Sequence, residues 1–247
     1  MALPPDAGID GGMSGPGQRW LLLHGTPLTP QVWEGASGYL RRYGPVWSPD
    51  VSPAEGSQDA QAALAAGLVS ALEQFPGRLH IVGHSFGGQV AIDVALLAPQ
   101  RVQTLTVLCS RDTPFPAFAA AAARLRHGDP VDTSAVLGRW FTAPELAAGG
   151  AVVTYARQCL QRADRASWAA ALDAIARYDR ADRVGSIGVR CTVIAAELDQ
   201  VSTPAAMSAL ADRLPQATLH ILAGAAHMTP FTDPARLGTL LTRAARS

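Results

Sequence analysis

A serine, an aspartate and a histidine each stand shortly after a short apolar run in this sequence. Ser85 lies within Gly83-His84-Ser85-Phe86-Gly87, Asp199 follows the run 190–196, and His227 follows the run 218–222. A serine hydroxyl attacks a carbonyl efficiently only when a base takes its proton and a carboxylate orients that base. The three residues therefore predict acyl transfer, with Ser85 as nucleophile, His227 as base and Asp199 as orienting acid.

The glycines around Ser85 indicate a very sharp turn. The apolar residues of 79–82 predict a strand before the turn, and 89–97 predicts a helix after it. Side chains at Gly83 and Gly87 would collide where the strand and the helix close up, and the serine backbone is expected to be strained. The turn would present the Ser85 hydroxyl at the start of the helix, where negative charge is favoured.

The segment His24-Gly25-Thr26 follows another predicted strand, at 20–23. A tetrahedral intermediate of acyl transfer needs two hydrogen-bond donors aimed at its oxyanion. The backbone N–H groups of Phe86 and Thr26 are the natural pair, and Gly25 would let the loop approach closely. We expect His24 to support this loop rather than to act as the base.

Other interpretations of these residues remain open at the level of sequence. Asp112 follows the predicted strand 102–109 and is a rival for the orienting acid, with capping or a loop role as its alternative. Asp199 could instead be a turn residue or a helix cap, and His227 could be a polar loop residue.

The elements that must position these residues alternate between strand and helix. Strands are expected at 20–23, 45–47, 79–82, 102–109, 190–196 and 218–222, and helices at 30–41, from Ser57 or Asp59 to Phe75, at 89–97, 204–214 and 233–246. Between 111 and 183 only helices are expected, at 115–125, 133–141, 152–161 and 167–178. This pattern predicts an α/β fold with a mostly parallel sheet flanked by helices. Residues 1–110 and 184–247 would form the core, and 111–183 a helical cap.

Four segments resemble α/β-hydrolases: Leu21–Thr26, Val82–Gly88, Val193–Pro204 and Ala225–His227. The resemblance spans nearly the whole chain and implies the α/β-hydrolase fold. The similarity to 3-oxoadipate enol-lactonase-like proteins rests on Val193–Pro204 and on three cap segments: Arg139-Trp140-Phe141-Thr142, Trp168–Ile175 and Arg177-Tyr178-Asp179. That similarity implies hydrolysis of an ester or lactone that bears a carboxylate, as in enol-lactonases or carboxylesterases.

Two residues are candidates for substrate contacts. Arg111 could pair with a substrate carboxylate, or it could be a surface arginine beside Asp112. Trp140 could line an apolar pocket, or it could pack the cap on the core.

The sequence also departs from these relatives in two places. Only a Gly/Pro-rich lead, Met1–Gly17, precedes Trp20, where relatives carry a strand hairpin, and the loop from Asp50 to Ser57 is short and proline-rich. Both departures concern edges or pocket walls, so they affect the substrate more than the chemistry.

Composition excludes several functional classes. The formal net charge is +0, so no basic field favours nucleic acid or an anionic membrane. The first residues lack the features of a signal peptide, and no apolar stretch is long enough to span a membrane. Cys109, Cys159 and Cys191 fit no metal spacing and are expected to be buried thiols. We therefore expect a cytoplasmic protein with no cofactor and no metal, whose partner is a small ester or lactone and whose oligomeric state is open.

Three functions remain compatible with this sequence. The first is a serine hydrolase that works through an acyl-enzyme. The second is a carbon–carbon bond hydrolase or lyase on the same fold, and the third is a ligand-binding protein without catalysis.

Overall fold

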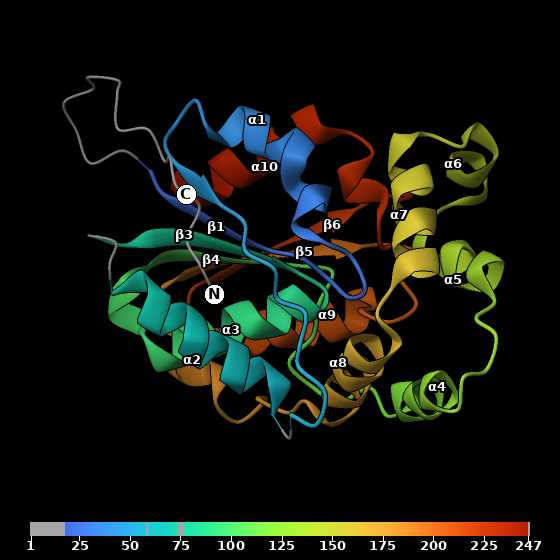
Figure 1. The fold of residues 1–247 in the computed structure, drawn as a ribbon. Coiled ribbons are helices and arrows are strands. Elements are labelled where there is room, and N and C mark those ends of the chain that lie inside the picture. Colours follow the sequence, from blue (N-terminus) through green and yellow to red (C-terminus); the bar gives the residue numbers. More distant parts are fainter. Residues whose placement is uncertain (1–17, 58, 74–76, 247) are drawn as a thin grey trace.

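The computed structural model describes residues 18–57, 59–73 and 77–246. Six parallel strands form one sheet in the order β2-β1-β3-β4-β5-β6 (Figure 1). They are β1 (Trp20–Leu23), β2 (Val46–Trp47), β3 (Leu79–His84), β4 (Val102–Leu108), β5 (Arg190–Ala196) and β6 (Ala217–Leu222). The α/β fold class predicted from the alternation of strands and helices is confirmed.

Helices cover both faces of this sheet (Figure 1). On one face lie α2 (Ala60–Leu72), α3 (Phe86–Leu97) and α9 (Pro204–Arg213), and on the other lie α1 (Glu34–Leu40) and α10 (Pro234–Arg246). Short 3-10 helices occur at Pro30–Trp33, Pro99–Arg101, Val184–Ser186 and Thr229–Phe231. The expected helix at 30–41 is thus a 3-10 turn followed by α1. The expected lead Met1–Gly17 and the expected helix end at Phe75 lie outside the described residues.

The burial of each strand reflects its position in the sheet. Every residue of β3 is buried, because helices cover this strand on both faces. In β6, at the edge of the sheet, exposed and half-buried residues alternate for most of its length, and Ile221 is 51% exposed. No helix among the described residues has the length and apolar character needed to cross a membrane.

Five helices separate β4 from β5, where four were expected. They are α4 (Ala117–Arg126), α5 (Thr133–Trp140), α6 (Ala143–Ala148), α7 (Ala151–Arg162) and α8 (Arg165–Arg177). Helices α5, α6 and α7 lie beyond the carboxyl ends of the strands (Figure 1). Helix α8 packs on α4 and also contacts α2, which covers the sheet. We use the word cap for residues 111–183, whose separation as a domain stays a prediction.

Arg180, just after α8, ties the cap to two helices of the sheet layer. Its guanidinium donates to both carboxylate oxygens of Asp93 in α3, at 2.9 and 3.0 Å, and to Asp59, the N-cap of α2, at 2.6 Å. Tyr178 also donates its hydroxyl to Asp93, at 3.0 Å. Burial raises the pKa of Asp93, and the charge and hydrogen bonds of Arg180 oppose that rise.

Candidate active site

Ser85 occupies a strained turn between β3 and α3. Its φ of 53° and ψ of −121° lie in a region that residues with side chains rarely adopt. A Cβ on Gly83 would lie 2.2 Å from the carbonyl oxygen of Gly87, and one on Gly87 would lie 2.3 Å from that of Leu23. Only glycine fits at both places, so the sequence G-x-S-x-G is what allows the strand and the helix to close around the serine.

Two of its hydrogen bonds tie the backbone of Ser85 to the neighbouring strand β4 and the residues after it. Its N–H donates to the carbonyl of Leu108, at 3.0 Å, and its carbonyl accepts from the Ser110 hydroxyl, at 2.6 Å. Both partners come from the end of β4, the neighbouring strand. The side chain of Ser85 is left half-exposed at the carboxyl end of the sheet.

Asp199 and His227 lie in contact although they follow different strands. The Asp199 carboxylate accepts a hydrogen bond from His227 Nδ1, at 2.6 Å, and both residues are buried. The other carboxylate oxygen accepts from the backbone N–H groups of Val201 and Ser202, at 2.9 and 3.0 Å. Burial favours a higher pKa for Asp199, but His227 and these two amides outweigh it and hold the pKa below its ordinary value. Asp199 is therefore a charged, fixed acceptor that orients the imidazole.

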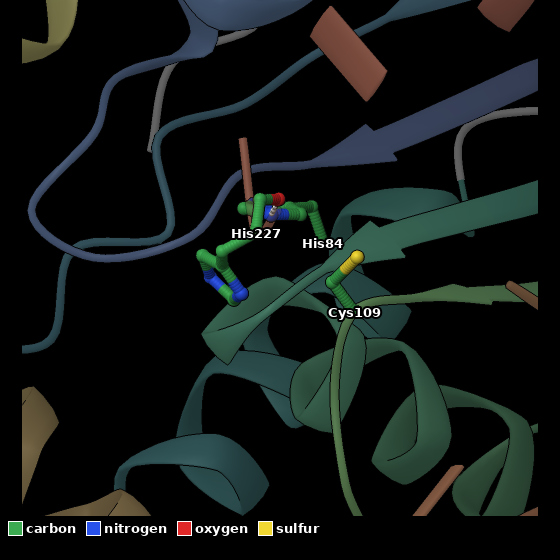
Figure 2. A group of neighbouring side chains, drawn as sticks. All are labelled: His84, Cys109 and His227. Carbon is green, nitrogen blue, oxygen red and sulfur yellow. Dashed lines mark hydrogen bonds between the residues drawn. The ribbon is translucent and has the colours of Figure 1, made fainter. Parts of the chain in front are cut away.

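His84, next to Ser85, joins the turn to the His227 loop. It is fully buried, and burial first, then the neighbouring His227, lower its pKa well below the ordinary value. The neutral ring donates from Nε2 to the carbonyl of His227, at 3.2 Å, and the two ring centroids lie 4.7 Å apart (Figure 2). This role of His84 was not predicted from the sequence. The contact places the His227 loop directly beside the Ser85 turn.

No hydrogen bond joins Ser85 Oγ to His227 Nε2 among the described residues. Contacts of this kind are often long in free enzymes and tighten when a substrate binds. The structure thus brings the loops of the three residues together and aligns the pair formed by Asp199 and His227.

The loop after β1 approaches Ser85 as closely as a glycine allows. A Cβ on Gly25 would lie 2.9 Å from Ser85 Cβ and 2.9 Å from His84 Nδ1. Thr26 follows directly, and Phe86 is the first residue of α3. In the described part of the chain, neither Thr26 nor Phe86 donates its backbone N–H to an acceptor. These two amides are available as donors on either side of Ser85.

His24 supports this loop through contacts of both ring nitrogens. Its Nδ1 bonds the Gly25 carbonyl at 2.9 Å, and its Nε2 lies 3.0 Å from the Val51 amide and 3.1 Å from an Asp50 carboxylate oxygen. The hydrogen bond from His24 is the main cause that lowers the pKa of Asp50 far below its ordinary value. Both ring nitrogens are engaged, which fits the expected supporting role.

The cap is attached to the same loop. Tyr155 in α7 donates its hydroxyl to the carbonyl of Thr29, at 3.1 Å, and accepts from the Thr29 N–H, at 2.9 Å. Burial raises the pKa of Tyr155, so this hydroxyl stays protonated at neutral pH. Sequence reasoning missed this contact, because a tyrosine on a helix gives no sign of its partner.

A cavity of about 360 Å³ lies between this loop and the cap. Thr26 lines it, so the cavity reaches one of the two candidate oxyanion donors. Its wall combines apolar and polar groups, and its lining residues are Thr26, Pro27, Leu28, Thr29, Gln31, Asp50, Ser52, Tyr155, Gln158, Cys159, Arg162, Ala163, Asp164, Ser167 and Trp168.

Asp112, the rival acid, is engaged elsewhere. It is fully buried and accepts two hydrogen bonds from Arg213 in α9, at 2.8 and 2.6 Å. His227 bonds Asp199 instead. The geometry therefore favours Asp199 as the orienting acid.

Arg111 and Trp140 are the candidates for substrate contacts, and they touch the loops of Asp199 and His227, respectively. The Arg111 guanidinium donates to the carbonyl and hydroxyl of Thr113, at 2.9 and 3.1 Å, and to the carbonyl of Val201, at 3.0 Å. It also lies over the Phe115 ring. Trp140 is half-buried, and its carbonyl accepts from the Met228 N–H, at 2.8 Å. Their contacts with a substrate stay predictions.

His84, Cys109 and His227 form a buried group with donor atoms within 4.8 Å of one another (Figure 2). Such a set could in principle hold a soft metal ion. However, burial raises the pKa of Cys109 well above its ordinary value and keeps the thiol protonated. The chemistry of the donors therefore does not favour a metal centre.

Comparison with known proteins shows the family. The model of the alpha/beta hydrolase family matches residues 20–238. A pimeloyl-[acyl-carrier protein] methyl ester esterase of Nitrosomonas europaea is 33% identical over 98 residues, which are 39% of this chain and 39% of that protein. This chain thus spans about two fifths of the length of that curated relative.

Solved structures agree over nearly the whole chain. An enol-lactonase from Burkholderia xenovorans LB400 superposes with a TM-score of 0.84 at 20% identity, covering 96% of this chain and 95% of its own. A thermophilic esterase from Thermogutta terrifontis gives a TM-score of 0.81 at 25% identity, covering 93% and 90%. These likenesses and the sheet order show the same fold. The family model, which matches most of the chain, shows that the chain belongs to the alpha/beta hydrolase family.

Proposed function

We propose that this chain is a serine hydrolase that cleaves a small ester or lactone through an acyl-enzyme. The observation that carries the proposal is the 2.6 Å hydrogen bond between His227 and a charged, buried Asp199, on a loop that His84 attaches to the Ser85 turn. This arrangement supplies a nucleophile, a base and an orienting acid in the order typical of the family.

In the proposed mechanism His227 Nε2 takes the proton of Ser85 as Oγ attacks the substrate carbonyl. Asp199 stabilises the imidazolium that forms. The N–H groups of Phe86 and Thr26 donate to the oxyanion, and the N-terminus of α3 adds a favourable field. His227 then gives its proton to the leaving oxygen. A water molecule, deprotonated by His227, attacks the acyl-enzyme and releases the acid and Ser85.

The cavity beside Thr26 is lined by the loop after β1 and by the cap, but not by Ser85, Phe86 or His227, so we place only the part of the substrate beyond the reacting carbonyl there. A volume of about 360 Å³ with a mixed polar and apolar wall suits a compact group. The relatives named as a methyl ester esterase, an esterase and an enol-lactonase support the same bond class. A cytoplasmic location, without nucleic-acid or membrane partners, remains our expectation from the composition.

Replacing the nucleophile tests the proposal directly. Ser85→Ala removes the only group that can form the acyl-enzyme in this mechanism, so turnover of p-nitrophenyl acetate should fall about a thousandfold or more. A fluorophosphonate probe should label the wild type once, by intact mass, and should not label Ser85→Ala.

The matched control is Ser186→Ala, at an exposed serine in a 3-10 helix away from the site. It should keep both turnover and labelling. Turnover of Ser85→Ala within a few-fold of the wild type would contradict the proposal. A panel of simple esters, enol-lactones and ring-fission diketones then separates ester hydrolysis from carbon–carbon cleavage, and failure of the probe to label would favour a binding protein.

A further inference from the structure

The loop that carries His227 is held from two sides. From the core, His84 donates to the His227 carbonyl, at 3.2 Å, and Leu198 donates its N–H to the Ala225 carbonyl, at 2.8 Å. The loop follows β6, the edge strand, which pairs with β5 alone within the sheet. It therefore has fewer neighbours in the sheet than the loops that carry Ser85 and Asp199.

The core also holds this loop through Glu197, which accepts from the Gly224 N–H, and through Asp199, which accepts from His227 Nδ1. The cap supplies further anchors, and they fall on the residues that flank His227. The N–H of Met228 donates to the carbonyl of Trp140, at 2.8 Å. The N–H of Ala226 donates to the hydroxyl of Thr229, at 2.8 Å, and this hydroxyl donates to Glu145 Oε2, at 3.0 Å. Trp140 ends α5 and Glu145 lies in α6, so two cap helices contact the loop that carries His227, the proposed general base.

Glu145 is itself fixed before it meets this loop. It belongs to a capping box in which its Oε2 accepts from the N–H of Thr142, at 2.7 Å, and from the Thr142 hydroxyl, at 2.8 Å. The Thr229 hydroxyl has one proton, which it gives to Glu145, so its lone pairs face the Ala226 N–H. Charge-assisted bonds to a carboxylate are stronger than bonds between neutral groups. The Ala226 N–H, just before His227, therefore donates to the Thr229 hydroxyl, and this hydroxyl donates to the Glu145 carboxylate.

We propose that Glu145, acting through Thr229, is a positioning residue for His227, and that this part of the cap belongs to the catalytic scaffold. The inference rests on the proposed function for its kinetic consequence. The two backbone contacts that flank His227 set the direction in which Nε2 points, while Asp199 fixes only the other side of the ring. Releasing one flank should let the ring swing away from Ser85 without changing the cavity, which neither Glu145 nor Thr229 lines.

The test replaces Thr229 with residues of matched size. Thr229→Val keeps the volume and removes the hydroxyl, whereas Thr229→Ser keeps the hydroxyl. With p-nitrophenyl acetate, Thr229→Val should lower kcat about tenfold with KM within twofold of the wild type, because small misplacements of catalytic groups are costly. Thr229→Ser should keep at least half of the wild-type kcat. Glu145→Ala should follow Thr229→Val, and Glu145→Gln, which retains an acceptor oxygen, should recover part of the loss.

A control variant separates positioning from loss of cap stability. Arg165 in α8 donates to the carbonyls of Leu125, in α4, and Asp129, just after α4, so Arg165→Ala weakens the cap away from α5, α6 and the His227 loop. We expect a lower melting temperature for Arg165→Ala but a kcat within twofold of the wild type. An equal loss of kcat in Arg165→Ala and Thr229→Val, or in Thr229→Ser and Thr229→Val, would overturn the inference.

Proton NMR provides a readout that does not depend on turnover. The short bond between His227 Nδ1 and Asp199 should give a downfield proton resonance, assigned by its loss in His227→Gln. This resonance should broaden or disappear in Thr229→Val and persist in Thr229→Ser. An unchanged resonance in Thr229→Val would overturn the positioning role, even if Ser85→Ala had already shown that the proposed function is wrong.

Discussion

At the scale of single residues, the proposed chemistry depends on positions where a side chain would not fit. Gly25 shows this most directly, because it separates the loop of Thr26 from the turn of Ser85. The space that a Cβ would need is already filled by Ser85 and by the buried ring of His84. The glycine therefore sets the distance between the Thr26 amide, one of the two proposed oxyanion donors, and the nucleophile.

We predict that Gly25→Ala lowers kcat about a hundredfold, since losing one oxyanion donor has an effect of that order. The added methyl group must push the loop away from Ser85, and Thr26 moves with it. The measurement is turnover of p-nitrophenyl acetate by the folded variant. Gly188→Ala is the control, because nothing lies within 4 Å of a Cβ at that position. Equal activities of the two variants would show that the close approach is not needed.

At the scale of elements, a buried ion pair between Arg180 and Asp93 helps to join the cap to the sheet layer. Arg180 and Asp93 have side chains only 12% and 6% exposed, and Asp59 at the start of α2 shares the same guanidinium. A buried carboxylate that loses its partner is strongly destabilising, by about 3–5 kcal/mol. This contact therefore couples α8 to α2 and α3.

We predict that Arg180→Met lowers the free energy of unfolding by about 3 kcal/mol or more, because Asp93 stays buried without its cation. Urea unfolding followed by circular dichroism measures the change. Arg124→Met is the control, since Arg124 and its partner Asp129 are largely exposed and such pairs contribute about 0–1 kcal/mol. If both variants lost the same stability, the pair at Arg180 would not be the anchor.

The sequence was most informative about strands and least informative about contacts of the cap. Apolar runs predict strands, and parallel strands end at one edge of the sheet, so Ser85, Asp199 and His227 could be placed together from their spacing alone. Helix α6 was missed because it has only six residues. The sequence does carry a signal for this helix: Thr142 and Glu145 are three residues apart, which is the spacing of a capping box.

Partners across the cap were not predictable in this way. Tyr155 with Thr29, and Glu145 with Thr229, are far apart in the chain and meet only through the packing of helices on loops. Periodicity shows which face of a helix is apolar, but it does not show which polar group it meets.

At the scale of the whole molecule, buried histidines make stability depend on pH. His80 in β3 bonds the Thr104 hydroxyl, at 2.8 Å, and packs on Trp20. Burial first, and then the charge of Arg190, lower its pKa from 6.5 to about 4. In the unfolded chain this residue takes up a proton near pH 6.5, whereas the folded protein resists protonation until about pH 4. The folded state therefore loses stability as the pH falls from 6.5 toward 4.

We predict that His80→Gln reduces this loss. Because the pKa of His80 is lowered from 6.5 to about 4, its contribution to this loss is at most about 3 kcal/mol. The variant should show a smaller difference between the free energies of unfolding at pH 7.5 and pH 4.5 than the wild type, measured in urea. His84, whose pKa is also lowered, should leave part of the dependence in place. His127→Gln, at an exposed histidine, should behave like the wild type.

The order of the strands has a consequence for local unfolding. Ser85 and Asp199 follow β3 and β5, which have neighbours on both sides, whereas His227 follows β6, which ends the sheet. Edge strands are the first to open in local fluctuations, well below the cost of global unfolding. Amide protons of β6 would exchange with solvent before those of β3. The base would then leave the site while the nucleophile and the acid are still in place, so the protein can be inactive and yet almost entirely folded.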